Sequence, residues 1–360
     1  MFINMKPKIS LMIHTASHDV FLQNQNINSY FESVVDCLKR QTFKAFEFIY
    51  IDTFYEDNKE KFENIIKDCP FQIKHVPIHK NHRYWFDQDC CYISAAKNTG
   101  VLYADGDLLI TCDDGEYFPD DLLQRYWANY NDKFLMHAFH KRMKTIKTDN
   151  GEIVYPIDGD IYINDHRASN VATNPVYRHN YGTWAFAGSS FTLEDALKLN
   201  GFNERMDGCK SLEDCDFGTR LQMIGRQFTL DKAGFVYILD HQSYGDAMNC
   251  NWESKTEADG QLTTPVSAIE PKKKINNLIA IENYGMCRCA IELIDLRANW
   301  NPLTPKHFEI IKRETIKYRN FDPFEEANKS NIEIWLKTPT FDLKKERTEL
   351  RVSTDWKWNE

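Results

Sequence analysis

The amino-acid sequence predicts an α/β protein with a mostly parallel central sheet, followed by a mainly helical C-terminal extension. Short apolar runs alternate with segments of helical periodicity through residues 9–127, the pattern of strands and helices wound into a parallel sheet. After about residue 250 the charge density rises, and a new helical pattern follows two prolines. We therefore expect an α/β domain at residues 1–250 and a helical extension at residues 251–360.

The first strands and helices are predicted in chain order. Residues 9–14 are a short apolar run, typical of a buried strand. Residues 29–32 (SYFE) form a capping box, and the apolar residues after it repeat at helical spacing. Residues 46–51 and 71–76 predict the next two strands, with a helix around residue 62 between them. Because these strands are apolar on both sides, we expect helices on both faces of the sheet.

Further elements are expected in the middle of the chain. A helix is predicted at residues 93–103 and a fourth strand at residues 108–112. Pro119 suits the first turn of another helix, where proline is favoured. Residues 141–181 are polar and rich in turn residues, which predicts a long functional loop with short strands.

The last elements before the expected boundary are two helices and a strand. Thr192 is a helix cap, and Gly201 ends the helix that it begins. A further helix is expected at residues 212–224, and residues 235–239 predict a final strand.

The composition is that of a packed globular protein. The chain has 360 residues, of which 42% are hydrophobic, enough for one large domain and an extension. Its net charge of −9 gives no overall attraction to nucleic acid or to an anionic membrane, so neither is indicated as a partner.

The sequence shows no pattern typical of export or of membrane insertion. The residues after Met1 lack a basic-then-apolar signal pattern, and no apolar run approaches the roughly 20 residues that span a bilayer. The ten cysteines include no CxxC pair, and the spacing of Cys287 and Cys289 is not that of a usual zinc site. We expect a cytoplasmic protein with free thiols and no transmembrane segment.

An acidic turn is the most informative segment. The apolar strand at residues 108–112 leads directly into Asp113, Asp114 and Glu116. In open α/β sheets ligands bind at the carboxyl ends of the strands. Carboxylates are hard oxygen ligands that suit Mg²⁺ or Mn²⁺, and such an ion can neutralise a diphosphate as it leaves. The alternative interpretation is a solvated acidic turn without a ligand.

Two other segments carry residues suited to chemistry. Glu213 and Asp214 begin the helix predicted at residues 212–224, and an ionised aspartate there can accept a proton from an attacking hydroxyl. Simple helix capping is the alternative explanation for these acids. Lys97, in the helix at residues 93–103, lies among small residues and can reach a phosphate.

In this order the segments resemble the family 2 glycosyltransferases of the Rossmann-like GT-A fold. The resemblance extends over about residues 7–239 and rests on five motifs. These are ISLMIHT ending at Thr15, the strand ending at Asp52, the run Lys97-Asn98-Thr99-Gly100 with Ala104-Asp105-Gly106, the pair Asp113-Asp114, and Leu197 to Glu204 followed by Glu213-Asp214-Cys215-Asp216. The motif Cys-Asp-Asp-Gly-Glu departs from the usual Asp-x-Asp, so it leaves open which acid is the principal metal ligand.

The resemblance implies a role for each of these residues. The donor nucleotide is expected at Thr15, Asp52, Lys97 and Asp113. The metal is expected at Asp114, Asp113, Glu116 and His241. Asp214 is implied as the catalytic base, with Glu213 beside it, and Trp184 as a residue that stacks on a sugar. A structural role for Trp184 and for His241 is the alternative in each case.

The implied activity is metal-dependent, inverting transfer of a hexosyl or pentosyl group from a nucleotide diphosphate sugar to an acceptor hydroxyl. A saccharide is the expected acceptor, and a protein side chain or a modified nucleic-acid base is the alternative. Competing hypotheses are nucleotidyl transfer on a related fold and an inactive sugar-nucleotide-binding protein. The extension is expected to shape the acceptor side or to form a contact in a homo-oligomer.

Overall fold

The computed structural model describes the α/β part of the chain and a short stretch near its end. The described residues are 6–15, 29–79, 93–131, 134–164, 176–178, 188–202, 204, 213–239, 255–256, 262–263 and 341–353.

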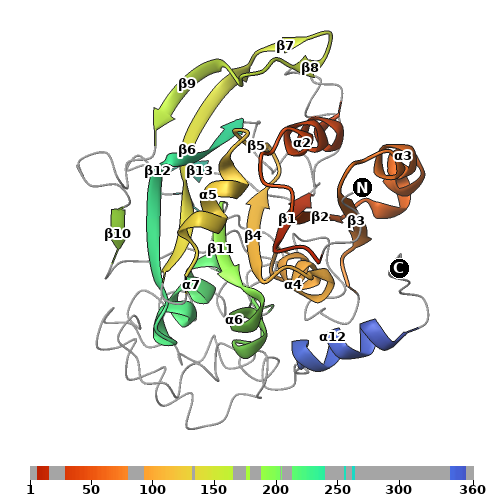
Figure 1. Cartoon of the computed structure of the whole chain (residues 1–360), viewed down its shortest axis with the longest axis vertical. Coiled ribbons are helices and arrows are strands. Elements are labelled where there is room, and N and C mark those ends of the chain that lie inside the picture. Colours follow the sequence, from red (N-terminus) through yellow and green to blue (C-terminus); the bar gives the residue numbers. More distant parts are fainter. Residues whose placement is uncertain are drawn as a thin grey trace.

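A large mixed sheet forms the centre of the molecule (Figure 1). Its strands are, in spatial order, β10 (Val176–Arg178), β12 (Gln227–Leu239), β6 (Phe134–Ile146), β11 (Ser189–Thr192), β4 (Leu108–Asp113), β1 (Ile9–Thr15), β2 (Phe46–Asp52) and β3 (Gln72–Pro77). The four strands from β4 to β3 are parallel, as are β6 and β12, whereas β11 runs antiparallel to both of its neighbours. Two further strands, β5 (Glu116–Tyr117) and β9 (Gly159–Asn164), pair with β12 and β6.

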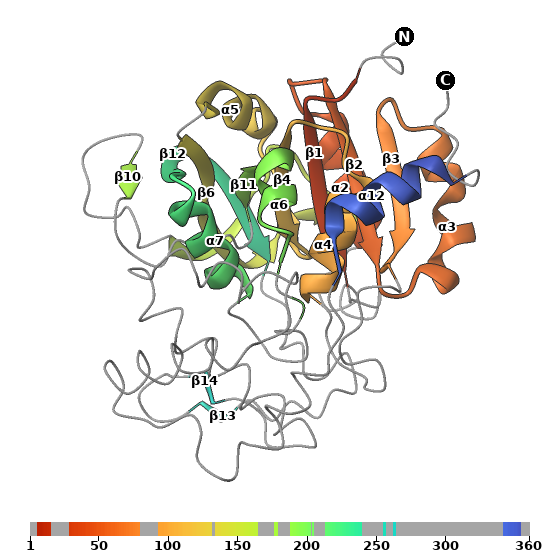
Figure 2. The same ribbon diagram turned by 90° about the horizontal axis from the view of Figure 1, so that it is seen from below.

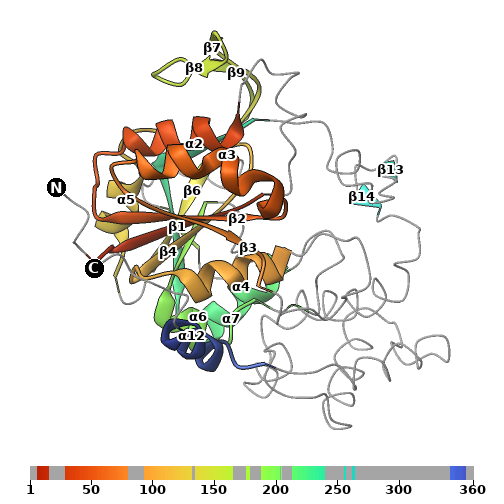
Figure 3. The ribbon, with the colours of Figure 1, turned by 90° about the vertical axis from the view of Figure 1, so that its right-hand side faces the viewer.

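Helices cover both faces of this sheet (Figure 3). On one face lie α2 (Tyr30–Lys39) and α3 (Tyr55–Lys67). On the other lie α4 (Ile93–Tyr103), α6 (Leu193–Lys198), α7 (Glu213–Met223) and α12 (Leu343–Val352). A short helix, α5 (Leu122–Asn129), follows β5. The arrangement confirms the predicted α/β fold class with its mostly parallel sheet.

Local signals in the sequence explain the helix starts. The Ser29 side chain accepts a hydrogen bond from the Glu32 amide, and the Thr192 side chain accepts one from the Asp195 amide. Gly201 follows α6 with a φ of +70°, a left-handed conformation that glycine adopts at little cost. The predicted caps are therefore confirmed, whereas α6 ends at Lys198, before the predicted end, and Asn200 is the first residue after it with a left-handed backbone.

The second half of the sheet differs from the prediction. β6 was not expected, and it runs through Ile146 into the segment predicted as a loop. β12 begins at Gln227, well before the predicted strand, and a β-bulge interrupts its pairing with β6 between Asp231 and Phe235. Charged residues on β6 and the bulge in β12 break the simple alternation that marks a strand in a sequence. A small hairpin of β7 (Thr148–Asp149) and β8 (Glu152–Ile153) extends from β6.

The C-terminal helix α12 packs on the α/β domain, although the chain between residues 264 and 340 is outside the described residues. Figures 2 and 3 show α12 beside α4. Leu343 is fully buried in the common hydrophobic core. Asn200 holds the start of the helix, since its amide accepts a hydrogen bond from the Leu343 backbone at 2.8 Å and donates one to the Phe341 carbonyl at 2.9 Å.

Two arginines of α12 complete this contact. Arg347 donates hydrogen bonds to the carbonyls of Val101 (3.1 Å) and Leu102 (2.5 Å), which belong to the last turn of α4. Arg351 forms an ion pair with Asp105, just after that helix. The carbonyl groups at a helix end need such donors. The end of the chain thus contributes to the α/β domain, and the boundary predicted near residue 250 stays a prediction.

The structure also describes the environment of three cysteines and the character of the helices. Cys37, Cys69 and Cys112 are buried free thiols, as expected for these three residues. None of the helices in the described ranges combines the length and the apolar character that a membrane span requires.

Candidate functional site

The carboxyl ends of the parallel strands bring the predicted donor residues to one edge of the sheet. In register, Thr15 of β1 pairs with Asp52 of β2, and His14 of β1 pairs with Asp113 of β4. The Thr15 hydroxyl donates a weak hydrogen bond of 3.4 Å to the Asp114 carboxylate. Asp113 and Asp114 therefore lie on the same sheet edge as Asp52, which is the position the sequence predicted.

The acidic turn presents its three acids differently. Asp113 is exposed, Asp114 is 4% exposed, and Glu116 is 1% exposed on β5. Gly115 has a φ of +79°, so the turn between Asp114 and Glu116 needs a residue that tolerates a left-handed backbone. Tyr30 of α2 supports the turn, since its hydroxyl donates to the Asp113 carbonyl at 3.1 Å.

Glu116 is enclosed more deeply than a surface ligand would be. Neither of its carboxyl oxygens makes a hydrogen bond within 3.5 Å in the described part of the chain. Burial raises the pKa of this carboxyl well above its usual range, and the neighbouring Asp113 adds to the effect. Glu116 thus lies beneath the turn, while Asp113 and Asp114 are the acids nearer its surface.

Lys97 connects the acidic turn to the second acidic segment. Its ammonium lies 3.0 Å from the Glu213 carboxylate, and both side chains are almost fully buried. Burial alone would lower the pKa of this ammonium, but the charge of Glu213 raises it above the usual value. Asp113 and Asp214 act in the same direction. One fixed cation therefore lies within electrostatic reach of acids from β4 and from α7.

The start of α7 carries Glu213 and Asp214, which are 7% and 9% exposed. Arg220, on the same helix and fully buried, donates hydrogen bonds of 2.7 Å to the carbonyls of Leu199 and Gly201. These bonds join α7 to the turn that follows α6. The position of the two acids is therefore set by packing of α7 against that turn.

The same turn is joined to α4 through Asn98. The Asn98 amide donates to the Phe202 carbonyl and to the Glu204 carboxylate, both at 2.9 Å, and accepts from the Phe202 amide at 2.7 Å. A side chain at Gly201 would meet Asn98 at 2.1 Å, so this close approach requires glycine. Two of the predicted motifs, at residues 97–100 and 197–204, thus form one structural unit that places Lys97 opposite Glu213.

Asp52 lies at the expected edge, but protein groups occupy its carboxylate. One oxygen accepts from the Phe54 amide at 2.7 Å, and the other accepts from the Asn58 amide and from His75, both at 2.9 Å. The side chain is 1% exposed. Its contact with a nucleotide stays a prediction, and its observed interactions organise the start of α3.

His14 of β1, a residue without a predicted role, lies at the same sheet edge, in register with Asp113. Burial lowers the pKa of His14 to about 4, an effect that the charge of Asp114 opposes and that of Lys97 reinforces. The imidazole is therefore neutral near pH 7. The signal in the sequence was its place as the last residue but one of a strand that ends at the ligand edge.

Two predicted residues, Trp184 and His241, lie outside the described residues. The chain leading to His241 can be followed as far as Leu239, whose amide donates to the Gly115 carbonyl at 2.9 Å. Ile238 is in register with Glu116. β12 therefore ends beside the acidic turn.

The expected metal ion can be compared with the acids at this edge. Among them, no group of three histidine, cysteine or acidic side chains is arranged to hold a metal ion. Mg²⁺ is commonly bound by one or two carboxylates, with water and substrate phosphates as its other ligands. Asp113 and Asp114 form such a pair at the sheet edge. The residues present therefore fit an ion that binds together with a diphosphate.

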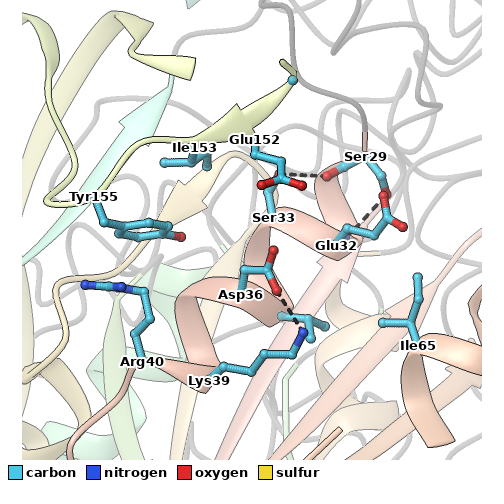
Figure 4. A pocket seen from close by; sticks show the side chains of 12 residues that line it. Ser29, Glu32, Ser33, Asp36, Lys39, Arg40, Ile65, Glu152, Ile153 and Tyr155 are labelled. Carbon is cyan, nitrogen blue, oxygen red and sulfur yellow. Dashed lines mark hydrogen bonds and ion pairs between the residues drawn. The ribbon is translucent and has the colours of Figure 1, made fainter. Parts of the chain in front are cut away.

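A separate pocket of about 610 Å³ lies beside α2 and the β7–β8 hairpin (Figure 4). Glu32 and Asp36 of α2 line it together with Glu152 of the hairpin. Arg40 and Tyr155 also line it, and the Arg40 guanidinium lies 4.3 Å from the centre of the Tyr155 ring. None of the predicted site residues lines this pocket, so it is distinct from the sheet edge described above.

Comparisons with known proteins found similarity at the level of structure alone. No protein family matches the sequence, and no curated protein matches it. Among solved structures, residues 1–349 of TarS from S. aureus superpose with a TM-score of 0.47 and 11% identity, covering 95% of this chain and 92% of that one. The complex of the same protein with UDP-GlcNAc superposes with a TM-score of 0.48 and 12% identity, covering 95% of this chain and 92% of that one. Its complex with UDP superposes with a TM-score of 0.46 and 13% identity, covering 87% of this chain and 73% of that one. Family membership stays a prediction from the sequence motifs.

Proposed function

We propose that this protein transfers a sugar from a nucleotide diphosphate sugar to an acceptor hydroxyl, with a divalent metal ion. One observation carries the proposal. At the carboxyl edge of the parallel strands, Lys97 stands between the acidic turn of β4 and the acids that begin α7, with 3.0 Å between its ammonium and Glu213. A diphosphate leaving group needs cations, and an attacking hydroxyl needs a base, and this edge offers residues for both.

The donor side of the site is built from β1, β4 and α4. Asp113 and Asp114 would hold Mg²⁺ or Mn²⁺, which when bound neutralises charge on the diphosphate. Lys97 supplies a second, permanent positive charge whose position is fixed by Glu213. Thr15 and Asp52 end the two strands where the nucleoside would lie. His241, the further metal ligand that the resemblance implies, follows Leu239 by two positions in the chain and lies outside the described residues.

The acceptor side is built from the start of α7. Since Glu213 is paired with Lys97, it acts as a positioning residue, and Asp214 is the base. The Asp214 carboxylate takes the proton of the acceptor hydroxyl as that oxygen bonds to the anomeric carbon. The bond from this carbon to the diphosphate breaks at the same time, and the nucleoside diphosphate leaves with the electron pair. A single displacement of this kind inverts the anomeric configuration.

Asp214→Asn tests the proposal, because it keeps the size of the side chain but cannot accept a proton. Loss of a positioned base costs about a hundredfold to ten-thousandfold in rate. We expect the variant to bind the nucleotide sugar nearly as wild type does and to transfer it at such a reduced rate. Donor affinity, thermal stability and turnover are measured on one preparation, with a panel of nucleotide sugars and saccharide acceptors.

Glu194→Gln is the matched control, since Glu194 is an exposed acid in the first turn of α6. It should change neither turnover nor donor binding. If Asp214→Asn lowered only the melting temperature and left turnover per folded molecule intact, Asp214 would be a helix cap and not the base. If no nucleotide sugar bound to wild type, the proposal itself would be wrong.

A further inference from the structure

Lys141, in the middle of β6, lies against two aromatic side chains of β12. Its ammonium is 3.4 Å from the centre of the Phe235 ring and 5.6 Å from that of Tyr237. The two rings meet edge to face, with their centres 5.0 Å apart. All three side chains are half-buried. The ammonium therefore sits on an aromatic surface that is itself partly open.

This lysine differs from the buried lysines of the molecule in its surroundings. Lys97 is paired with Glu213, and Lys74 lies 2.6 Å from both Glu47 and Asp105. In the described part of the chain, Lys141 forms no ion pair. Burial is the cause that lowers its pKa, without an opposing contribution from a carboxylate.

A partly dehydrated ammonium without a carboxylate is incompletely compensated. The ring faces supply a modest attraction, about 0.5–2 kcal/mol for a cation–π contact. An ammonium has three N–H donors, and an aromatic face satisfies only the direction that points at it. An anion placed on the open side would complete the environment of this cation, with the rings providing an apolar surface beside it.

The strand register connects this surface to the acidic turn. Tyr237 pairs with Lys141 on one side and with Tyr117 of β5 on the other. Residues directly opposite each other in a sheet point to the same face, so the three side chains share one face. Adjacent strands are about 4.8 Å apart, which places Lys141 about 10 Å from β5. Asp114 lies just before β5 in the chain.

Lys141 also differs in exposure from Lys144, the next lysine of β6. Lys144 is on the same strand, three residues further, beyond the irregular pairing of β6 with β9 at Arg142 and Met143. It is exposed, whereas Lys141 is half-buried. β6 thus carries one lysine with a distinct environment, Lys141, and one exposed lysine, Lys144, that serves as its control.

We propose that Lys141, Phe235 and Tyr237 form an anion-recognition site for the acceptor, so that the acceptor is a saccharide bearing a negatively charged group. The inference rests on the proposed sugar transfer and names its acceptor class. The charged group binds the Lys141 ammonium, and the adjoining carbon skeleton lies on the open edges of the two rings. The hydroxyl to be glycosylated then points along the sheet toward the acidic turn.

The test compares charged and neutral sugars of the same size on the full chain. Binding of a hexose 6-phosphate, a hexuronate, the neutral hexose and inorganic phosphate is measured by ligand-observed NMR. We expect both charged sugars to bind wild type at least about tenfold more tightly than the neutral hexose, equivalent to about 1.4 kcal/mol. If the hexose 6-phosphate and inorganic phosphate bind tightly and the hexuronate does not, the charged group is a phosphate. If the hexuronate binds tightly as well, the site accepts anions in general.

Variants assign this preference to the site. Lys141→Gln should abolish it, Lys141→Arg should retain it, and Lys144→Gln should leave it unchanged. Phe235→Leu should weaken binding of the charged sugars but not of inorganic phosphate, because the ring contacts the carbon skeleton. Equal binding of charged and neutral sugars, or equal effects of Lys141→Gln and Lys144→Gln, would overturn the proposal. Melting temperatures establish that each variant is folded.

Turnover separates this inference from the proposed function. If nucleotide sugars neither bind nor react while the preference for charged sugars persists and depends on Lys141, sugar transfer is wrong and the anion site remains. If the enzyme uses charged and neutral acceptors with equal kcat/KM, sugar transfer stands and the anionic acceptor is wrong.

Discussion

Lys97 is the side chain on which the electrostatics of the candidate site depend. Its ammonium is buried between acids of two segments, and Glu213 is its ion-pair partner at 3.0 Å. Removing one member of a buried pair leaves an uncompensated charge, whereas removing both members can be nearly neutral. The pair therefore offers a double-variant experiment that distinguishes a structural from a functional role.

Lys97→Met should lower the free energy of unfolding by about 3–5 kcal/mol, the usual cost of an unpaired buried charge. The double variant Lys97→Met/Glu213→Gln should recover most of this stability. Donor binding should stay weak in both variants, since the diphosphate lacks its permanent cation. Urea unfolding and nucleotide titration measure the two quantities. Equal stability of the single and double variants would show that the pair contributes no coupling.

The acids at the sheet edge show which properties of single residues could be predicted from the sequence. The acids after the fourth strand could be predicted to lie at the ligand edge, because a run of apolar residues ends there. Their different exposures could not, since Glu116 is enclosed by β12, a strand from a distant part of the chain. The sequence also did not predict the partners of Asp52, whose carboxylate is hydrogen-bonded to Asn58 and His75.

Among the helices, α12 has a role that periodicity did not indicate. It docks on α4 and on the turn after α6, the same two elements that place Lys97 and Glu213. Arg347 donates to two carbonyls at the end of α4, where intrahelical donors are lacking. The helix therefore supports α4, the helix that carries Lys97, at its C-terminal end.

Arg347→Met should destabilise the protein by about 1–3 kcal/mol, because it leaves buried carbonyls of α4 without a donor. Lys345→Met is the matched control, since Lys345 is an exposed basic residue of the same helix. It should change stability by less than about 0.5 kcal/mol. Urea midpoints of the three proteins provide the comparison. Equal midpoints for Arg347→Met and Lys345→Met would mean that α12 does not support α4 in this way.

For the molecule as a whole, donor binding should be coupled to the metal. A ligand that binds only the folded state raises its stability by mass action. We expect a nucleotide diphosphate to raise the melting temperature with Mn²⁺ or Mg²⁺ present, and to lose most of this effect with a chelator. Asp114→Ala should abolish the metal-dependent part, and the exposed Asp149→Ala should preserve it. An equal rise in chelator would contradict the metal-assisted site.

The fold class, the strand and helix signals of the first half and the edge that carries the acids followed from the sequence. These properties depend on periodicity and capping between residues that are close in the chain. The contact of Lys97 with Glu213, 116 residues apart, and of Arg347 with Val101, 246 apart, required the folded structure. Such pairs form because packing of the sheet, α4, α7 and α12 brings distant segments together, and local sequence patterns carry no information about that packing.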